Sequence, residues 1–543
     1  MFQFPPVFGS GHHSSLHLTL HQKIMYKIYN PYVLASIATI GGLLFGFDIS
    51  SVSSFVDQEA YLEFFDHPSS IAQGGITASM AGGSFLTSIV CGYFVDKLGR
   101  RPVIQIASLF WVVGCAIQCS SRDLAQLICG RLIAGFGIGF ASSTVPVYIS
   151  ELAPKKIRGR LGGLFQWAVT WGIMIMFYIG YGCSFIEGNA SFRTAWGIMM
   201  IPGAILFAGT FFLAESPRWL AKNGRWEEAI HIISMIQSNG DVNHPDVALE
   251  IEEIREAVEI EKEAAQTSIV DLFRKDSIIR TSVGISAQIW QQLTGMNVMM
   301  YYIVYMFQMA GFEGNTVLVS SSIQYVINVV MTVPALLFID SWGRRRVLMA
   351  GSLLMGLWLL IMCILLGVYS IPLEGLSDND FVRITVENKH ASRAIISVSY
   401  LFVASFAPTW GPGIWLYCSE IFPTRQRGLA SGISAGANWI FNFALAMFVP
   451  TAFKNITWRT YIIFLVFCVV MTVHVYFMFP ETKGKTLEEI EMMWNAKIPA
   501  WKTSTWVPDN TPESRQAHLD EKHDNIAEGK HTENVMNEVA PEV

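Results

Sequence analysis

Long apolar runs recur along the whole chain, and each is long enough to cross a lipid bilayer as a helix. A membrane-spanning helix needs about 20 predominantly apolar residues, and it satisfies its own backbone hydrogen bonds in lipid. The runs therefore predict an all-α, polytopic membrane protein. We place about twelve spans, at Tyr32–Ser54, Gly75–Val95, Val103–Ser120, Leu124–Ser150, Leu161–Cys183, Ala195–Leu213, Thr281–Ala310, Val317–Ile339, Val347–Tyr369, Ala394–Cys418, Leu429–Thr451 and Thr460–Phe479.

The composition agrees with a membrane protein and excludes other classes. Only 15% of the 543 residues are charged and 52% are hydrophobic, whereas soluble proteins carry about 25% charged residues. The net charge of −6 comes mostly from the acidic C-terminal tail and predicts no nucleic-acid partner. All eight cysteines lie in or at the ends of apolar runs, so we expect them to pack as small hydrophobic groups. The histidines of residues 1–30 lack a fixed ligand spacing, so neither a metal nor a cofactor is predicted.

Lysine and arginine gather in alternate short loops, and this pattern orients the predicted helices. Basic motifs follow the second, fourth, eighth and tenth spans, whereas residues 54–74 contain no lysine or arginine. Cytoplasmic loops carry the excess of basic residues. We therefore expect these loops and both termini to be cytoplasmic, and the protein to lie in the plasma membrane. Two glycosylation sequons, at Asn189 and Asn455, fall in loops that this orientation places outside.

Three short motifs occur twice in the same order. DKLGRR matches DSWGRRR, ELAPKKIRG matches EIFPTRQRG, and ESPR corresponds to ETKG. This repeat indicates two six-helix halves with the same orientation. The predicted organisation is a cytoplasmic N-terminal tail (1–30), a first bundle (31–214), a cytoplasmic helical linker (215–278), a second bundle (279–480) and a cytoplasmic C-terminal tail (481–543). Residues 1–30 have no signal-peptide core, and the charged C-terminal tail is expected to be largely disordered from Lys485 onward.

These motifs together resemble the sugar porters of the major facilitator superfamily, and in particular fungal hexose transporters. The resemblance covers Gly41 to Gly484 and rests on the order of GGLLFGFD, DKLGRR, RLIAGFGIG, PVYISELAPKKIRG, ESPRWL, QQLTGMN, DSWGRRR, GPGIWLYCSEIFPTRQRG and PETKG. It implies transport of a monosaccharide, a hexose such as glucose or alternatively xylose, by alternating access. The expected partners are the sugar, a proton and the lipid bilayer, and the expected functional unit is a monomer.

Polar side chains interrupt the seventh span. Gln291, Gln292 and Asn297 lie around Gly295, which is expected to break the helix locally. An unpaired amide in an apolar medium costs roughly 4–8 kcal/mol on the harshest scale. The amides could join helices to one another, but three of them beside a glycine favour a polar cavity. The resemblance adds further sugar-contacting residues: Gln166, Asn328, Trp415 and Asn438, with Trp439 and Asn442 nearby.

Asp48 places a carboxylate inside the first span. A charge at this depth costs about 2.5–3.5 kcal/mol on insertion scales, so Asp48 needs a partner or a proton. The resemblance makes Arg131 that partner. A structural ion pair and a proton-coupling pair are both compatible with these residues. We expect proton-coupled symport, with an uncoupled facilitator as the alternative.

The repeated motifs contribute two sets of charged residues, one from each half. The resemblance implies that they latch the ends of the helices together in one state and release them in the other. The first charge cluster comprises Asp96, Arg100, Arg101, Glu151, Arg158 and Glu215. The second charge cluster comprises Asp340, Arg344, Arg345, Glu420, Arg427 and Glu481.

Two other classes of function are less compatible with the sequence. A transporter-like sugar sensor usually carries a long, repetitive cytoplasmic tail, which is not found here. A membrane enzyme would need a catalytic motif, and the chain has no H-E-x-x-H helix, G-x-S-x-G elbow or P-loop. The glycine-rich GFGIGF segment is expected to pack helices through its small residues.

Overall fold

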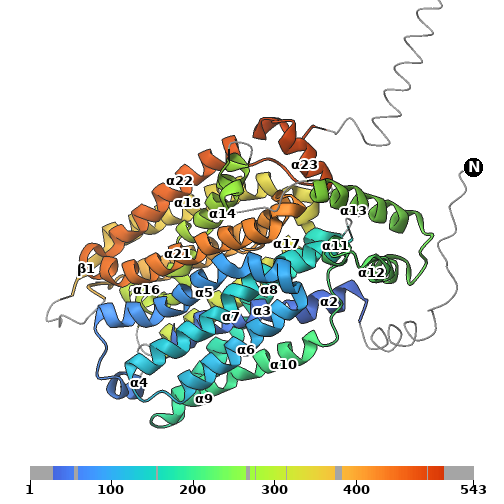
Figure 1. Ribbon diagram of the computed structural model, residues 1–543. Coiled ribbons are helices and arrows are strands. Elements are labelled where there is room, and N and C mark those ends of the chain that lie inside the picture. The colour runs from blue at the N-terminus through green and yellow to red at the C-terminus, as the bar shows by residue number, and fades with distance from the viewer. Residues whose placement is uncertain are drawn as a thin grey trace, which may run out of the picture.

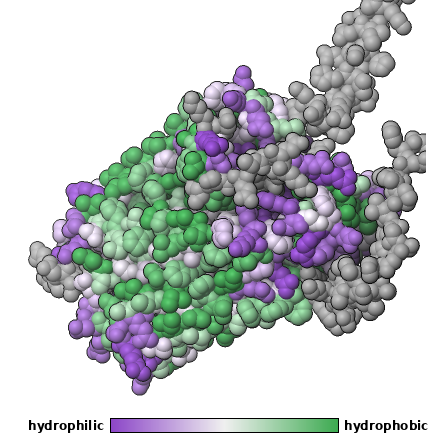
Figure 2. Space-filling view, in the orientation of Figure 1, coloured by the Kyte–Doolittle hydropathy of each residue, from purple (hydrophilic) through white to green (hydrophobic). Residues whose placement is uncertain are grey.

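The structure consists of two helical bundles that lie side by side, with a group of further helices at one end (Figure 1). The computed structural model describes residues 28–53, 55, 59–154, 157–263, 269–274, 277–312, 315–373, 382–485 and 487–506. The face shown in Figure 2 carries a broad hydrophobic belt across the bundles, and hydrophilic residues gather at the two ends. Exposed apolar side chains such as Leu353 of α18 and Val469 of α22 belong to this belt. Such a belt is the surface that a bilayer would cover.

The first bundle contains the first six predicted spans. Its helices are α2 (Pro31–Ala38), α3 (Ile40–Ser53), α4 (Glu59–Phe64), α5 (Ser70–Leu98), α6 (Arg100–Cys119), α7 (Leu124–Leu152), α8 (Arg158–Cys183), α9 (Ala190–Ile198) and α10 (Met200–Thr210). Glycines allow these helices to approach closely. A Cβ on Gly137 of α7 would collide with the Ala107 carbonyl of α6, and one on Gly139 with the Ser84 carbonyl of α5. The packing role expected for GFGIGF is therefore confirmed.

Short helices connect the two bundles, and the second bundle follows. The connecting elements are α11 (Pro217–Lys222), α12 (Trp226–Ser238), α13 (Pro245–Glu263) and the 3-10 helix η2 (Ile269–Phe273). The second bundle contains α14 (Ile278–Leu293), α15 (Met296–Tyr301), α16 (Ile303–Met309), α17 (Asn315–Trp342), α18 (Arg344–Tyr369), α19 (Lys389–Phe406), α20 (Trp410–Ile421), α21 (Thr424–Ile456), η3 (Thr457–Arg459) and α22 (Thr460–Met478). A two-stranded antiparallel hairpin, β1 (Ser370–Pro372) and β2 (Ile384–Val386), lies between α18 and α19.

Four of the predicted spans, the first, sixth, seventh and tenth, are divided into shorter helices, and a glycine or a proline marks the break in the last two. The seventh span stops at Leu293 and resumes at Met296, because Gly295 adopts a φ of 88°. The tenth span divides into α19 and α20 around Pro408, which supplies no backbone N–H to a helix. Within the described residues, ten segments are long and apolar enough to span a membrane; one of them, Gln426–Met478, contains both of the last two predicted spans. The broken seventh span is not among the ten because its pieces are short.

The C-terminal tail is more ordered than the sequence predicted. Helix α23 (Leu487–Asn495) and the 3-10 helix η4 (Ala500–Lys502) follow the last span. Ile490 and Met493 of α23 are buried against the second bundle. The charge of this segment and its lack of a spanning run predict disorder, but they do not reveal its apolar face. Of the expected tails at 1–30 and 481–543, residues 1–27, 486 and 507–543 lie outside the described residues.

Candidate functional site

A small cavity lies between the two bundles, and amide side chains line it. We call it the amide cavity. Its volume is about 40 Å³. It is lined by Phe45, Ile49, Gln166, Val169, Ile173, Gln291, Gln292, Met296, Asn297, Met300, Asn328, Phe406 and Trp415. Both halves contribute to it, so a movement of one half relative to the other must change its shape.

The break in the seventh span determines how its amides are presented. Gln291 and Gln292 lie in the last turn of α14, and Asn297 lies in the first turn of α15. The glycine between them is required for two reasons. Its positive φ disfavours residues with a Cβ, and a Cβ here would lie 2.9 Å from Cγ of Phe464. All three amides, from the two sides of this break, line the same cavity.

The amides are hydrogen-bonded to one another and to the backbone. Gln291 Nε2 donates to the carbonyls of Trp410 and Gly411, at 3.0 and 3.1 Å. Gln292 Nε2 donates to Asn438 Oδ1 at 2.6 Å, and Asn297 Nδ2 donates to Gln292 Oε1. A buried amide needs such partners. A ligand rich in hydroxyl groups could replace some of these partners, because each hydroxyl both donates and accepts.

Six of the seven residues predicted to contact substrate line this cavity. Gln166, Asn328 and Trp415 do so together with Gln291, Gln292 and Asn297. The Asn328 Oδ1 atom is buried and has no hydrogen-bond partner among the described residues. Trp415 packs against Phe165, with ring centroids 5.4 Å apart.

Asn438 lies behind the cavity and supports it. Its Nδ2 donates to Gln288 Oε1 at 2.8 Å and to Gln291 Oε1 at 2.9 Å. Asn442 reaches Gln292 Oε1 at 3.5 Å. Gln288 was missed in the sequence, although its spacing of three and four residues from the two glutamines places it on the same side of α14. Trp439 donates from Nε1 to Ser142 Oγ at 3.0 Å, which joins the two halves.

Asp48 and Arg131 form an ion pair inside the first bundle. Arg131 Nη2 lies 2.8 Å from Asp48 Oδ2, and both side chains are buried. Arg131 also donates to the Ile76 carbonyl at 2.8 Å and to Ser51 Oγ at 3.0 Å. The second carboxylate oxygen, Oδ1 of Asp48, has no hydrogen-bond partner among the described residues. The pair does not line the amide cavity, but Ile49, the next residue of α3, does.

The first charge cluster is assembled where α5, α6, α7 and α11 meet. Arg100 donates from Nε and Nη2 to the two oxygens of Glu151, at 2.9 and 2.8 Å. Glu215 accepts from the backbone N–H groups of Arg100, at 3.0 Å, and Arg101, at 3.2 Å. Burial raises the pKa of the Glu215 carboxyl, although these donors and the Arg100 charge act in the opposite direction. Arg158, at the start of α8, is buried at the same end.

The second charge cluster repeats this arrangement in the other half. Arg344 Nη2 donates to Glu420 Oε1 at 2.9 Å. Glu481 accepts from the backbone N–H groups of Arg344, at 2.8 Å, and Arg345, at 3.2 Å. A hydroxyl completes each cluster: Ser216 donates to Glu151 at 2.6 Å, and Thr482 donates to Glu420 at 2.8 Å. The side chain of Asp340 lies outside the described residues.

The two clusters also touch across the interface between the halves. Arg427 Nη1 lies 3.9 Å from Glu151 Oε1, and both side chains are fully buried. A Cβ on Gly428 would lie 3.2 Å from a carboxylate oxygen of Asp96. The charged residues of the two halves are therefore in contact with one another at this end of the molecule.

Comparisons with known proteins agree with this architecture. Residues 34–494 match the family of sugar (and other) transporters. The high-affinity glucose transporter of Kluyveromyces lactis is 55% identical over 493 residues, which cover 90% of this chain and 89% of that protein. The high-affinity glucose transporter 1 of Candida albicans is 54% identical over 501 residues, 91% of each chain. The solved structure of the proton:xylose symporter XylE bound to 6-bromo-6-deoxy-D-glucose has a TM-score of 0.73 and 25% identity, covering 86% of this chain and 99% of that one. This multi-pass membrane protein therefore belongs to the family of sugar transporters.

Proposed function

We propose that this chain carries a hexose, with glucose as the first candidate, across the plasma membrane by alternating access, and that it works as a monomer. The observation that carries the proposal is the amide cavity: uncharged donors and acceptors from both halves surround one apolar-walled space. Amides can replace the water around sugar hydroxyls without a net charge. The face of Trp415 offers a surface for the C–H side of a pyranose. The high identity to two proteins named as glucose transporters supports the same substrate.

The small volume of the amide cavity supports a transport cycle with moving halves. Ligand pockets usually occupy about 300–1,000 Å³, whereas this cavity occupies about 40 Å³. A sugar can therefore enter only after the halves or the α15 segment move apart. Two repeats that rock around a central site would produce this movement. In this scheme the end with the charge clusters, and both termini, face the cytoplasm.

Uptake of labelled glucose tests the proposal directly. The protein would be expressed in cells that lack their own hexose carriers, and we expect saturable uptake that unlabelled glucose inhibits. Binding of glucose without uptake would instead identify a transporter-like sensor. Absence of both from a correctly inserted protein would contradict the proposal.

Truncation of the cavity amides is expected to weaken sugar binding. Gln292→Ala and Asn297→Ala each remove hydrogen bonds worth about 0.5–1.5 kcal/mol, which corresponds to an affinity loss of up to about tenfold. Equilibrium binding to purified protein measures the change. Gln324→Ala is the matched control, because Gln324 is a buried amide that donates to the Met299 carbonyl at 2.8 Å and does not line the cavity. Equal binding losses in all three variants would show that these amides only join helices.

Neutralising Glu151 is expected to impair turnover more than sugar binding. Glu151→Gln weakens the paired hydrogen bonds from Arg100 and leaves Arg427 without the nearby carboxylate. Breaking a buried ion pair costs about 3–5 kcal/mol, and the end that holds the clusters should therefore open. We expect at least tenfold slower exchange of sugar across proteoliposomes. Glu228→Gln is the control, because its pair with Arg225 is partly exposed, with 49% of the arginine and 27% of the glutamate side chain accessible, and such surface pairs are worth about 0–1 kcal/mol.

A further inference from the structure

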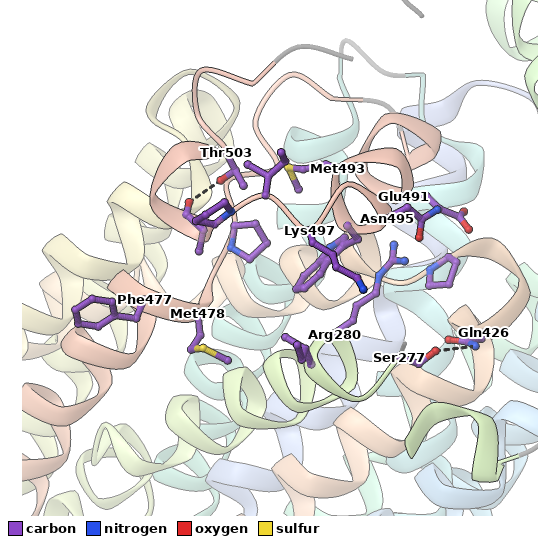
Figure 3. Close-up of a pocket in the computed structure, with 17 residues that line it drawn as sticks. Ser277, Arg280, Gln426, Phe477, Met478, Glu491, Met493, Asn495, Lys497 and Thr503 are labelled. Atoms are coloured by element: carbon purple, nitrogen blue, oxygen red, sulfur yellow. Dashed lines mark hydrogen bonds between the residues drawn. The ribbon is translucent and has the colours of Figure 1, made fainter. Parts of the chain in front are cut away.

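A second, larger cavity lies at the end of the molecule that holds the charge clusters. Its volume is about 470 Å³. It lies between the start of α14, the start of α21, the end of α22 and the segment that contains α23 and η4 (Figure 3). We call it the α14–α23 pocket. It is separate from the amide cavity, since the residues that line the two are different.

Arg280 of α14 lines this pocket with an unpaired guanidinium nitrogen. The residue is 7% exposed, and its Nη2 has no hydrogen-bond partner among the described residues. Its Nε donates to the Ile421 carbonyl, and its guanidinium lies over the ring of Trp494, 5.6 Å from the centroid. The indole Nε1 of Trp494 is a second buried donor without a partner. Buried donors are rarely left unpaired; here two such donors belong to side chains that line one pocket, which points to an acceptor that the chain itself does not supply.

The charge in the pocket is also incompletely balanced. Lys497 lines the pocket together with Arg280, and both side chains point into it (Figure 3). Glu491 is the one carboxylate among the described lining residues; its charge acts on Arg280, but the two form no direct ion pair within the described part of the chain. One carboxylate does not neutralise two cations, and the indole N–H also lacks an acceptor. An anion with several acceptor oxygens would satisfy these groups.

The pocket borders the apolar belt as well as the polar end. Ile279 and Phe477 line it, and they are 56% and 53% exposed. Phe477 continues the exposed apolar stripe of α22 that includes Val469 and Val473. A molecule with an anionic head and an apolar body could therefore reach the pocket from the side. The size is within the range of about 300–1,000 Å³ typical of small-ligand sites.

We propose that the α14–α23 pocket binds a phosphate-bearing anion between Arg280, Lys497 and the indole N–H of Trp494. The phosphate comes either from the headgroup of an anionic phospholipid or from a soluble phosphate compound. The bound anion would join the segment that contains α23 and η4 to α14, the helix that also carries Gln291 and Gln292. This inference depends on the residues that line the pocket and not on sugar transport.

The test compares two sources of phosphate on the full-length purified protein. One arm uses nanodiscs of phosphatidylcholine with and without phosphatidic acid, and native mass spectrometry counts the lipids released with the protein. The other arm titrates inorganic phosphate and ATP into protein in phosphatidylcholine alone and follows binding by calorimetry. The variants are Arg280→Gln, Lys497→Ala and Trp494→Phe. Lys502→Ala is the matched control, because Lys502 is an exposed cation of η4 that does not line the pocket.

We expect one tightly bound anion per chain, with an affinity about tenfold lower in Arg280→Gln and Lys497→Ala and unchanged in Lys502→Ala. Trp494→Phe removes the indole N–H together with the five-membered ring, keeps an aromatic ring beside the Arg280 guanidinium, and should lower the affinity severalfold without unfolding the protein. It therefore provides the test if Arg280→Gln does not fold. Binding in the first arm alone identifies a phospholipid, and binding in the second alone identifies a soluble phosphate. No binding in either arm, or equal binding by all variants, would overturn the proposal, and neither result depends on whether the protein transports sugar.

Discussion

Asp48→Asn is expected to abolish uphill accumulation of sugar while preserving exchange across the membrane. The asparagine amide mimics a permanently protonated carboxyl, so it cannot gain or release a proton during the cycle. In the parent protein, protonation of Asp48 would break its 2.8 Å pair with Arg131 and release α3 from α7. One proton crossing ~100 mV supplies about 2.3 kcal/mol. At about 1.4 kcal/mol per tenfold, this supports an accumulation of a few tens-fold.

The measurement is external alkalinisation when sugar is added to lightly buffered cells, with accumulation of a non-metabolised glucose analogue followed in parallel. Ser51→Ala is a matched control. It removes another hydrogen-bond partner of Arg131, at 3.0 Å, and leaves the carboxylate in place. This control should still accumulate the analogue. If the parent protein only equilibrates the analogue and moves no protons, Asp48 and Arg131 form a structural pair and the protein is a facilitator.

The general architecture could be predicted because it depends on signals that extend over many residues. Apolar runs of about 20 residues have few alternatives to spanning helices, and the repeated motifs showed two equivalent halves. The repeat also brought Glu151 and Glu420 to equivalent positions, each paired with an arginine. The glycine between the polar residues of the seventh span predicted a break, and the positive φ of Gly295 confirms it.

Other features depended on contacts between segments that are distant in the sequence. Nothing in the sequence around Gln288 shows that its side chain accepts a hydrogen bond from Asn438 of α21. The order of α23 results from burial of its apolar face against the second bundle, which a charged composition conceals. The α14–α23 pocket combines residues from both ends of the second half. Neither periodicity nor composition reports which of these distant surfaces meet.

A side chain at Gly92 is expected to hold the protein open at the end of the charge clusters. Gly92 lies in α5 where this helix crosses α21. A Cβ there would lie 2.6 Å from Cα and 2.9 Å from the backbone nitrogen of Leu429. Backbone atoms cannot move aside as a flexible side chain can, so Gly92→Ala should push α5 and α21 apart. The close approach of Gly428 to Asp96 and the 3.9 Å contact between Arg427 and Glu151 would then be lost as well.

Gly82→Ala provides the matched control, because it is the same substitution on the same helix. Its Cβ would lie 3.5 Å from the flexible side chain of Phe443, an ordinary contact distance. Because a change of ~1.4 kcal/mol alters the ratio of two states tenfold, Gly92→Ala should lower the rate of sugar transport at least about tenfold, whereas Gly82→Ala should remain near the parent rate. Single cysteines introduced near each end of α21 should show, by their labelling with a thiol reagent, which end of the protein has opened. Labelling near the charge clusters should increase in Gly92→Ala and stay at the parent level in Gly82→Ala. Equal labelling in both variants would mean that the approach of α5 to α21 at Gly92 does not control access to the amide cavity.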